Sequence, residues 1–325
     1  MTFVNTLVQR LLYAALLLFA VLILNFLLIH LAPGDIADTI AGGMGGADES
    51  VMQQIRSDYG LDLPWWQQLQ NYLVGVTRFD LGYSFFYNVP VTTLILEKLP
   101  ATLLLVVTAQ LLALLIGTLL GVLSARKPNG LTSHFVTLLA LFGYSAPVFW
   151  TGIMLLIAFS LMIPLFPVAG MQDVTVPPGT FAHILDVAHH MVLPVLTLTS
   201  VFLALYSRLC RASMMEVLGA DYIRTARAKG ISETQIIMKH ALKNSLSPVV
   251  TLAGLQFSAV ISGAVLVEAV FSWPGLGSLA LQSIIARDTP TILGILFFSS
   301  LVVIVGNLLT DLVLRLIDPR IRNER

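Results

Sequence analysis

Six long runs of apolar residues alternate with polar or charged segments along the chain. Each run is near or above the roughly 20 residues that an α-helix needs to cross about 30 Å of hydrocarbon. The pattern therefore predicts six membrane-spanning helices. We expect the third to be a tilted helix with an interfacial tail that leaves the bilayer near Pro164 and Pro167. The runs are Leu11–Ile29, Leu99–Leu123, Phe135–Phe166, His189–Ser207, Leu246–Val267 and Thr289–Thr310.

Composition agrees with this prediction. Mean hydropathy is +0.87, and charged residues make up 11% of the chain, compared with about 25% in soluble domains. The sequence predicts an all-α, multi-pass membrane protein with one transmembrane domain over residues 1–325, surrounded by membrane lipid and binding no nucleic acid. The first run has no small-residue cleavage site after it, so we expect a retained helix and not a removed signal peptide.

The basic residues predict the orientation. If both termini are cytosolic, fourteen of the eighteen Lys and Arg residues lie on the cytosolic side, as the positive-inside bias requires. Residues 208–248, between the fourth and fifth runs, contain seven of them. Residues 31–98 then form a long outer loop.

The outer loop carries signals for two short helices. Ser50 with Gln53 has the spacing of a capping box, and Gly60 follows as a C-cap. A second helix is predicted from Asp62, with Pro64 in its first turn. A structural lid over the helix ends and a surface that receives a partner are both open interpretations. One face of the second helix suits the membrane interface and carries Trp65, Leu69, Leu73 and Val76.

Small residues recur at intervals of four in two runs. Gly117 and Gly121 lie in the second run, and Gly254, Ser258 and Ser262 lie in the fifth. Small side chains at this spacing let helix backbones approach closely, so both helices are expected to pack tightly against neighbours.

The basic segment 208–248 is predicted to form two helices joined at a glycine. Asp221 can cap a short helix that runs to Lys229, and Gly230 suits the left-handed residue that ends it. Ser232 with Gln235 has the spacing of a capping box for a second helix that leads toward the fifth run. Such an element can transmit a push on its tip to the membrane helices. By physics alone, an ordinary solvated basic loop is an equally open interpretation.

The same segment contains an extended motif. It reads Glu216-Val-Leu-Gly-Ala-Asp-Tyr-Ile-Arg-Thr-Ala-Arg-Ala-Lys-Gly230, then His240-Ala-Leu-Lys-Asn244 and Pro248. This order resembles the cytoplasmic signature loop of ABC importer permeases of the dipeptide, oligopeptide and nickel class. The broader importer signature begins Glu-Ala-Ala, whereas this chain has Arg224, Thr225 and Ala226, so any contact of that glutamate is not expected here.

Other stretches follow the order of the same family over nearly the whole chain. The chain looks most like the first of the two permease subunits of a dipeptide importer. The stretches are Ala32-Pro-Gly-Asp35, Leu61-Asp-Leu-Pro64, Asp80-Leu-Gly-Tyr-Ser84, Leu99-Pro-Ala-Thr102, Pro147-Val-Phe-Trp150 and Glu268-Ala-Val-Phe-Ser-Trp-Pro-Gly-Leu-Gly277.

The resemblance implies a type I ABC importer-like permease in a bacterial inner membrane. Its partners would be a second, homologous permease, two cytosolic ATPase subunits and a periplasmic or lipid-anchored substrate-binding protein. This chain has no Gly-x-x-x-x-Gly-Lys-Ser/Thr loop, so ATP is expected only on the partner subunits, with no cofactor on this chain. The residues expected to couple to the ATPase are Asp221, Tyr222, Arg224, Ala226, Arg227, Lys229 and Gly230.

An acidic residue at the outer end of the fifth run is a candidate for gating. A carboxylate inside the bilayer is costly, but Glu268 at the boundary is expected to reach water, which favours a structural or gating role over substrate binding. The outer turn that follows contributes the other gate candidates, Trp273, Pro274 and Gly275.

Three alternative functions are less favoured by the sequence. A secondary transporter or channel would need coupling-ion carboxylates near the bilayer midplane, where none is visible. His183, His189 and His190 could hold a metal, but adjacent histidines are common in interfacial segments, so no metal site is predicted. An enzyme is disfavoured because no nucleophile or metal constellation is present. Peptides, glutathione-like molecules and nickel stay open as substrates.

Overall fold

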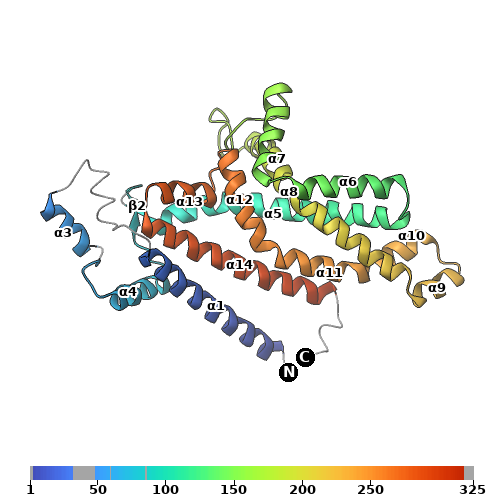
Figure 1. The fold of residues 1–325 in the computed structure, drawn as a ribbon, viewed down its shortest axis with the longest axis horizontal. Coiled ribbons are helices and arrows are strands. Elements are labelled where there is room, and N and C mark those ends of the chain that lie inside the picture. Colours follow the sequence, from blue (N-terminus) through green and yellow to red (C-terminus); the bar gives the residue numbers. More distant parts are fainter. Residues whose placement is uncertain (1–2, 32–47, 59, 85, 318–325) are drawn as a thin grey trace. The chain divides into compact units, whose positions relative to one another are not determined.

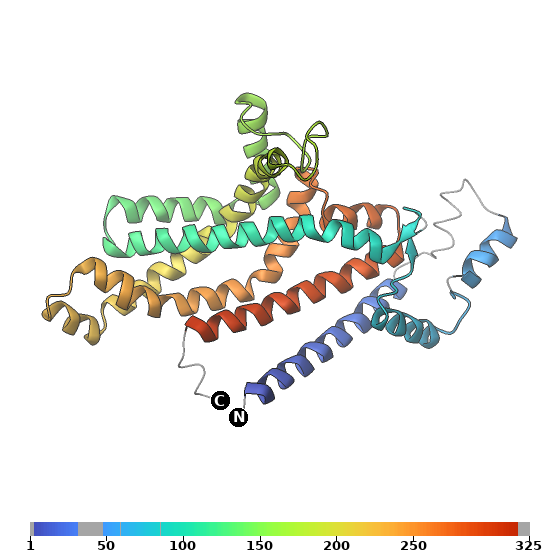
Figure 2. The same cartoon turned by 180° about the vertical axis from the view of Figure 1, so that it is seen from behind.

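The computed structural model describes residues 3–31, 48–58, 60–84 and 86–317, and they are almost entirely helical (Figures 1 and 2). Two short strands, β1 (Tyr83–Ser84) and β2 (Val89–Pro90), pair antiparallel. Two π-helical segments are η1 (Ile157–Met162) and η2 (Ile236–Ala241). The helices are α1 (Phe3–Leu31), α3 (Glu49–Asp58), α4 (Trp65–Thr77), α5 (Val91–Arg126), α6 (Leu131–Ser145), α7 (Val148–Leu156), α8 (Phe181–Leu218), α9 (Asp221–Ala228), α10 (Glu233–Gln235), α11 (Leu242–Leu255), α12 (Phe257–Val270), α13 (Leu276–Ile285) and α14 (Thr289–Ile317).

Several helices are suited to a membrane. Val91–Arg126, Phe181–Leu218 and Thr289–Leu314 are each long and apolar enough to cross it. A fourth span exists if Glu233–Leu255 and Phe257–Val270, which meet at 52°, form one bent unit. The shorter apolar helices are Leu12–Leu28 within α1, Val148–Met162 and Leu276–Ile285. The multi-pass helical character is thus confirmed, while the count of six and the cytosolic termini stay predictions.

Two predicted runs are not single straight helices. The third divides into α6 and α7, with Pro147 preceding α7 at φ −59° and ψ 138°. Proline lacks an N–H and disfavours a helical residue before it, so α6 ends just upstream. The fifth is broken at Gln256, between α11 and α12. The fourth begins earlier than predicted, at Phe181 of α8. Thr180 caps this earlier start by accepting a hydrogen bond from the His183 N–H at 3.1 Å.

The chain divides into two compact units. The first comprises residues 1–101 and 275–304, and the second comprises residues 102–274 and 305–325. The first unit has an apolar core that includes Val91, Ile95 and Phe298. Beside it, the buried Asp288 carboxylate accepts hydrogen bonds from the hydroxyls of Ser84 and Thr291. A carboxylate just before α14 satisfies the helix N-terminus and anchors the turn that contains Ser84.

The described part of residues 31–98, the predicted outer loop, forms both predicted short helices, with shifted starts. The helix α3 begins at Glu49, and the Asp48 carbonyl accepts from the Val51 and Met52 N–H groups, so the capping box predicted at Ser50 is wrong. Gly60 has φ +62°, and its N–H donates to the Ser57 carbonyl at 3.0 Å, which confirms the predicted C-cap.

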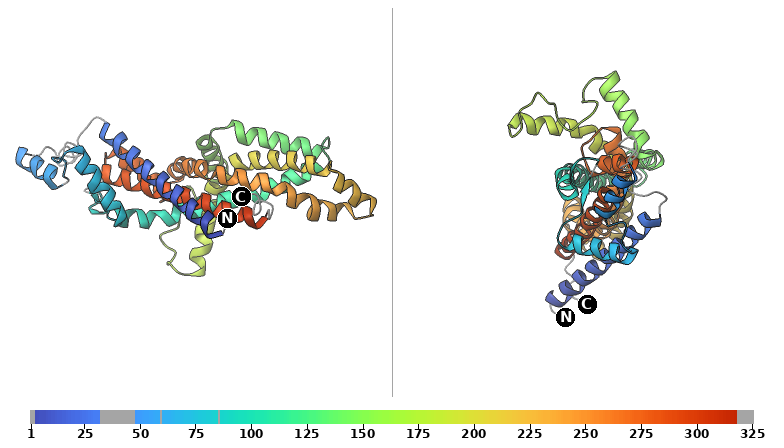
Figure 3. Two further views of the ribbon diagram at one scale, coloured as in Figure 1. Left: turned by 90° about the horizontal axis from the view of Figure 1, so that it is seen from below. Right: turned by 90° about the vertical axis from the view of Figure 1, so that its left-hand side faces the viewer.

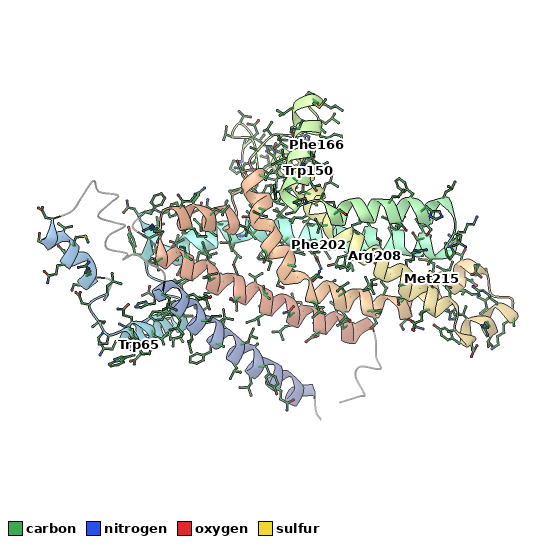
Figure 4. All side chains as sticks on the ribbon, in the orientation of Figure 1. Trp65, Trp150, Phe166, Phe202, Arg208 and Met215 are labelled. Atoms are coloured by element: carbon green, nitrogen blue, oxygen red, sulfur yellow. The ribbon has the colours of Figure 1, made fainter. Side chains whose placement is uncertain are left out.

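The second short helix, α4, begins at Trp65 and not at Asp62, because Pro64 precedes it as the N-cap. Trp65 is 58% exposed, whereas Val76 at the other end of the same face is buried (Figure 4). The two ends of the predicted face therefore have different surroundings.

In the second unit, α6, α7, α11 and α12 all pack against α8. The helix α5 also approaches it closely. A Cβ added at Gly121 would lie 2.6 Å from the Cys210 Cβ, and one added at Gly117 would lie 2.9 Å from the Tyr206 Cβ. Both glycines therefore allow the close helix contact that their spacing predicted. In the fifth run, Gly254 is buried against Thr310, whereas Ser258 and Ser262 are exposed.

Candidate functional site

The basic segment 208–248, here called the coupling loop, forms a helical hairpin at one end of the second unit. The end of α8 leads through Gly219 and Ala220 into α9, and α10, η2 and α11 return. The helix α9 packs against η2, and α11 packs against α8. Figure 1 and the left view of Figure 3 show α9 at the tip of this hairpin.

The short helix α9 has the end that its sequence predicts and a slightly different start. Ala220 is the N-cap, without a side-chain hydrogen bond, so Asp221 lies in the first turn and does not cap it as predicted. There its carboxylate interacts favourably with the positive end of the helix dipole, and it lies 3.4 Å from the Arg224 guanidinium. At the other end, the Gly230 N–H donates to the Arg227 carbonyl and the Ile231 N–H to the Ala226 carbonyl, at 3.0 and 3.3 Å.

This pair of bonds is the Schellman motif, which needs a left-handed residue at Gly230. Gly230 has φ +76°, as predicted. The turn after α9 therefore depends on a residue without a side chain.

The two faces of α9 have different surroundings. Ile223 and Ala226 are buried, at 0% and 8% exposure. Ala226 therefore packs beneath the helix, where a small side chain lets α9 lie close to the rest of the loop. Around the rest of α9 the side chains of Tyr222, Arg224 and Lys229 are exposed. The phenol oxygen of Tyr222 accepts a hydrogen bond from Asn244 Nδ2 at 2.8 Å, which ties α9 to α11.

An ion pair closes the turn between α9 and α10. Arg227 donates to both carboxylate oxygens of Glu233, from Nη2 at 2.8 Å and from Nε at 3.2 Å. This hydrogen bonding and the charge of Arg227 hold the pKa of the Glu233 carboxyl below its usual range, and the same contact raises the pKa of Arg227. Ser232 precedes α10, but its side chain makes no capping bond to a described residue, so the predicted capping box is wrong.

The return limb of the loop continues into the membrane helices. Residues Glu233 to Leu255 form one unbroken helical path through α10, η2 and α11. Ile236 and Ala241, at the two ends of η2, are fully buried. At the start of α11, the Ser245 hydroxyl lies 2.9 Å from the Met214 sulfur of α8. The return limb is therefore a continuous helical connection from the tip of the coupling loop to α11.

The predicted outer gate is assembled differently from the expectation. Glu268 is fully buried within this chain and does not reach water there. Its carboxylate accepts a hydrogen bond from the Thr102 hydroxyl at 2.6 Å, and its carbonyl accepts from the Trp273 N–H at 2.9 Å. Trp273 is also fully buried, Pro274 is half-buried, and Gly275 precedes α13 in the first unit. Because a buried carboxylate needs partners, this turn is fixed by side chains far away in the sequence.

A polar contact near the break in the fifth run was missed by the sequence analysis. Gln110 of α5 donates from Nε2 to the Tyr206 hydroxyl and to the Ala253 carbonyl, both at 2.9 Å. Ala253 lies in the last turn before Gln256, where helix carbonyls lack intrahelical donors. The one amide side chain in an otherwise apolar run was the signal, because buried polar groups in a membrane need a partner.

The three histidines in the first part of α8 make separate contacts. His189 Nε2 lies 2.8 Å from the Leu165 carbonyl, and His190 Nδ1 lies 2.9 Å from the Asp186 carbonyl. His183 is half-buried at the start of α8. Among the described residues, no group of three His, Cys, Asp or Glu side chains is placed to hold a metal ion.

Sequence comparison places nearly the whole chain in one family. The family model described as "Binding-protein-dependent transport system inner membrane component" matches residues 117–323, and its N-terminal companion matches residues 3–106. The chain is 39% identical to the dipeptide transport system permease protein DppB of Escherichia coli (strain K12), with 93% of this chain and 94% of the relative covered. It is 36% identical to the oligopeptide transport system permease protein AppB of Bacillus subtilis (strain 168), with 97% and 98% covered.

The fold has a counterpart among solved structures. A chain of the MetNI methionine ABC transporter, in an inward-facing conformation, aligns with a TM-score of 0.55 and 18% identity. The alignment covers 69% of this chain and 96% of that chain, and this likeness concerns the fold alone. Together with the family match, these findings show that the chain belongs to the family of binding-protein-dependent transport system inner membrane components, the permeases of ABC importers.

Proposed function

We propose that this chain is a permease subunit of an ATP-driven importer of di- or oligopeptides in a bacterial inner membrane. The relatives with 36% and 39% identity are named for oligopeptide and dipeptide transport, and they match over nearly their full length. The observation that carries the proposal is the coupling loop, because it places a short helix with an exposed polar face at the tip of a hairpin that continues into the membrane helices.

The proposed importer needs three kinds of partner component. A second, homologous permease completes the pore, and an external binding protein, periplasmic or lipid-anchored, delivers the peptide. Two cytosolic ATPase subunits bind ATP, since this chain lacks a phosphate-binding loop. In this assembly the exposed face of α9, with Tyr222, Arg224 and Lys229, is the docking surface for one ATPase.

The geometry suggests how docking is converted into movement. The Schellman turn at Gly230 and the pair between Arg227 and Glu233 hold α9 against the start of the return limb. A push on α9 therefore moves η2 and α11 as one body. The break at Gln256 redirects this movement into α12, which ends at Glu268. ATP-driven closure of the ATPases would open the pore outward, and hydrolysis would reset it inward.

Purification of the tagged chain from its native host in gentle detergent tests the assembly. We expect mass spectrometry to identify a second permease and ATPase subunits. The double variant Tyr222→Ala/Lys229→Ala should lose the ATPases and retain the second permease. The matched control is Met238→Ala/Lys239→Ala, which also removes one large apolar and one basic side chain exposed on the coupling loop. Recovery of the wild-type chain alone, under conditions that preserve a known ABC complex, would favour a secondary transporter.

Uptake by cells that express the complete system identifies the substrate class. We expect a labelled dipeptide to accumulate, and an excess of unlabelled peptide to compete. Accumulation of glutathione or nickel without peptide uptake would keep the ABC assembly and replace the substrate.

A further inference from the structure

A cavity of about 790 Å³ lies in the second unit between the end of α5, the end of α8 and the coupling loop. One wall is apolar and includes Leu123 of α5 with Met215 and Leu218 of α8. Figure 4 places Met215 on the last part of α8, which belongs to the coupling loop. The rim is basic, with Arg126 and Lys127 at the end of α5, both exposed.

The charge of this rim is only partly offset within the cavity. Glu233 is the one acidic residue among the lining side chains, and its carboxyl interacts electrostatically with Arg126 as well as with Arg227. Arg227, which also lines the cavity, already occupies both of its carboxylate oxygens. The lining residues therefore carry two positive charges in excess, on Arg126 and Lys127, directly beside an apolar wall. An occupant that satisfies both surfaces must have an anionic group joined to an apolar one.

An apolar stripe leads along α5 to this cavity. Its members are separated by four residues, so they lie on one face of the helix. All four are exposed by 45 to 60%. The stripe consists of Leu111, Leu115, Leu119 and Leu123. The last of these lines the cavity, and Arg126 follows three residues later, so the stripe and the basic rim are continuous.

We propose that this cavity binds one anionic phospholipid, with its phosphate between Arg126 and Lys127 and its acyl chains along the stripe on α5. The inference rests on the proposed function, which places the coupling loop on the cytosolic side of a bacterial inner membrane. Anionic lipid headgroups are available to basic residues on that side. Basic pockets between membrane helices on this side recognise such headgroups. The bound lipid would join the end of α5 to the coupling loop, so that α9 moves against a fixed point at the membrane surface.

Two other occupants use only part of the site. Free phosphate would satisfy the basic rim but leave the apolar wall and the stripe uncovered. An acidic segment of an ATPase subunit would pair with the basic rim, but it has no apolar surface to cover the leucine stripe on α5. A phospholipid matches the rim, the wall and the stripe together.

The test uses the complete importer complex, reconstituted in nanodiscs and released for native mass spectrometry. The probes are dioleoyl phosphatidylglycerol and dioleoyl phosphatidylcholine. Because each basic residue near an anionic surface contributes about 1 kcal/mol, Arg126→Gln/Lys127→Gln should weaken phosphatidylglycerol binding by about 30-fold. Phosphatidylcholine binding should not change. The matched control is Lys239→Gln/Lys243→Gln, which removes two exposed charges from the same loop outside the cavity, and it should retain the wild-type affinity.

Four results would overturn the proposal. Equal binding of the two lipids, or equal loss in both double variants, would show a general effect of surface charge. Displacement of phosphatidylglycerol by millimolar inorganic phosphate would show a free-anion site. Loss of ATPase subunits from Arg126→Gln/Lys127→Gln with unchanged lipid binding would show a protein contact. Peptide uptake by the wild-type complex is measured separately, so a wrong substrate would not be mistaken for a missing lipid site.

Discussion

The turn at Gly230 offers a graded test of coupling. We expect Gly230→Asn, Gly230→Ala and Gly230→Val to weaken ATPase binding and peptide uptake in that order of severity. Asn tolerates a left-handed backbone better than Ala, and a β-branched residue tolerates it least. The expected order comes from backbone conformation alone, because a Cβ at Gly230 would meet no described atom within 4 Å.

The magnitude follows from the observed dihedral angle. Gly230 has φ +76°, and a left-handed conformation costs an L-residue about 1–2 kcal/mol. If the loop must keep this conformation to dock, Gly230→Ala reduces the docking-competent fraction and weakens ATPase affinity by about 5- to 30-fold. The loss is an upper bound, since a loop that relaxes in the free permease and docks in another way would lose less.

The assay is titration of nucleotide-bound ATPase subunits onto the permease pair in nanodiscs, with uptake into proteoliposomes as the second measurement. Gly219→Ala is the matched control, because Gly219 lies in the same loop at φ −82°, a conformation that alanine adopts readily. It should leave both measurements unchanged. If Gly230→Ala and Gly219→Ala gave the same affinity, the turn would not control docking and the reasoning would be refuted.

Further predictions concern the interior and the loop. Gln110→Leu leaves buried polar groups without a donor and should lower the free energy of unfolding by about 1–3 kcal/mol, seen as a lower melting temperature in detergent; an unchanged value would mean that water replaces the amide. Gly121→Ala should destabilise by about 1–3 kcal/mol, because its Cβ would meet Cys210 at 2.6 Å; full stability would show that α5 and α8 separate easily. Because the pKa of the Glu233 carboxyl is lowered, the carboxylate stays ionised and paired with Arg227 through the pH range in which an ordinary glutamate titrates. The pair is lost only as pH falls through the lowered pKa. The ¹³C shift of the Glu233 carboxyl should therefore stay constant down through the ordinary glutamate midpoint of about pH 4.3 and change only at lower pH; a midpoint at or above the ordinary value would contradict the pairing.

Local signals in the sequence predicted the coupling loop well. A single glycine after a short polar helix is typical of the left-handed residue that ends it, and Gly230 ends α9 in this way. The exact starts were less predictable, because Ser, Asp and proline near a helix N-terminus compete for the cap. The helix α9 began one residue away from the expectation, and α4 began three residues away, because Pro64 could serve as the residue before the helix as well as within its first turn.

Features that depend on distant partners could not be predicted in the same way. The burial of Glu268 follows from Thr102, which lies 166 residues away in the sequence. The break at Gln256 has no proline or glycine at its centre. Its neighbouring carbonyl at Ala253 receives a donor from Gln110 on another helix, and only the packed structure brings these groups together. A hydrophobic run shows that a helix can enter the membrane, but not where it bends.

The π-helical segment η2 has a consequence for the direction of α9. Such a segment generally contains one residue more than the α-helix that it replaces. One residue corresponds to roughly 100° of rotation about a helix axis. Deleting a single residue from Ile236–Ala241 would restore regular α-helix and turn the tip of the hairpin by about that angle around α11. The side of the molecule to which Tyr222 and Lys229 point is thus set by one inserted residue, with no change to any side chain that would touch a partner.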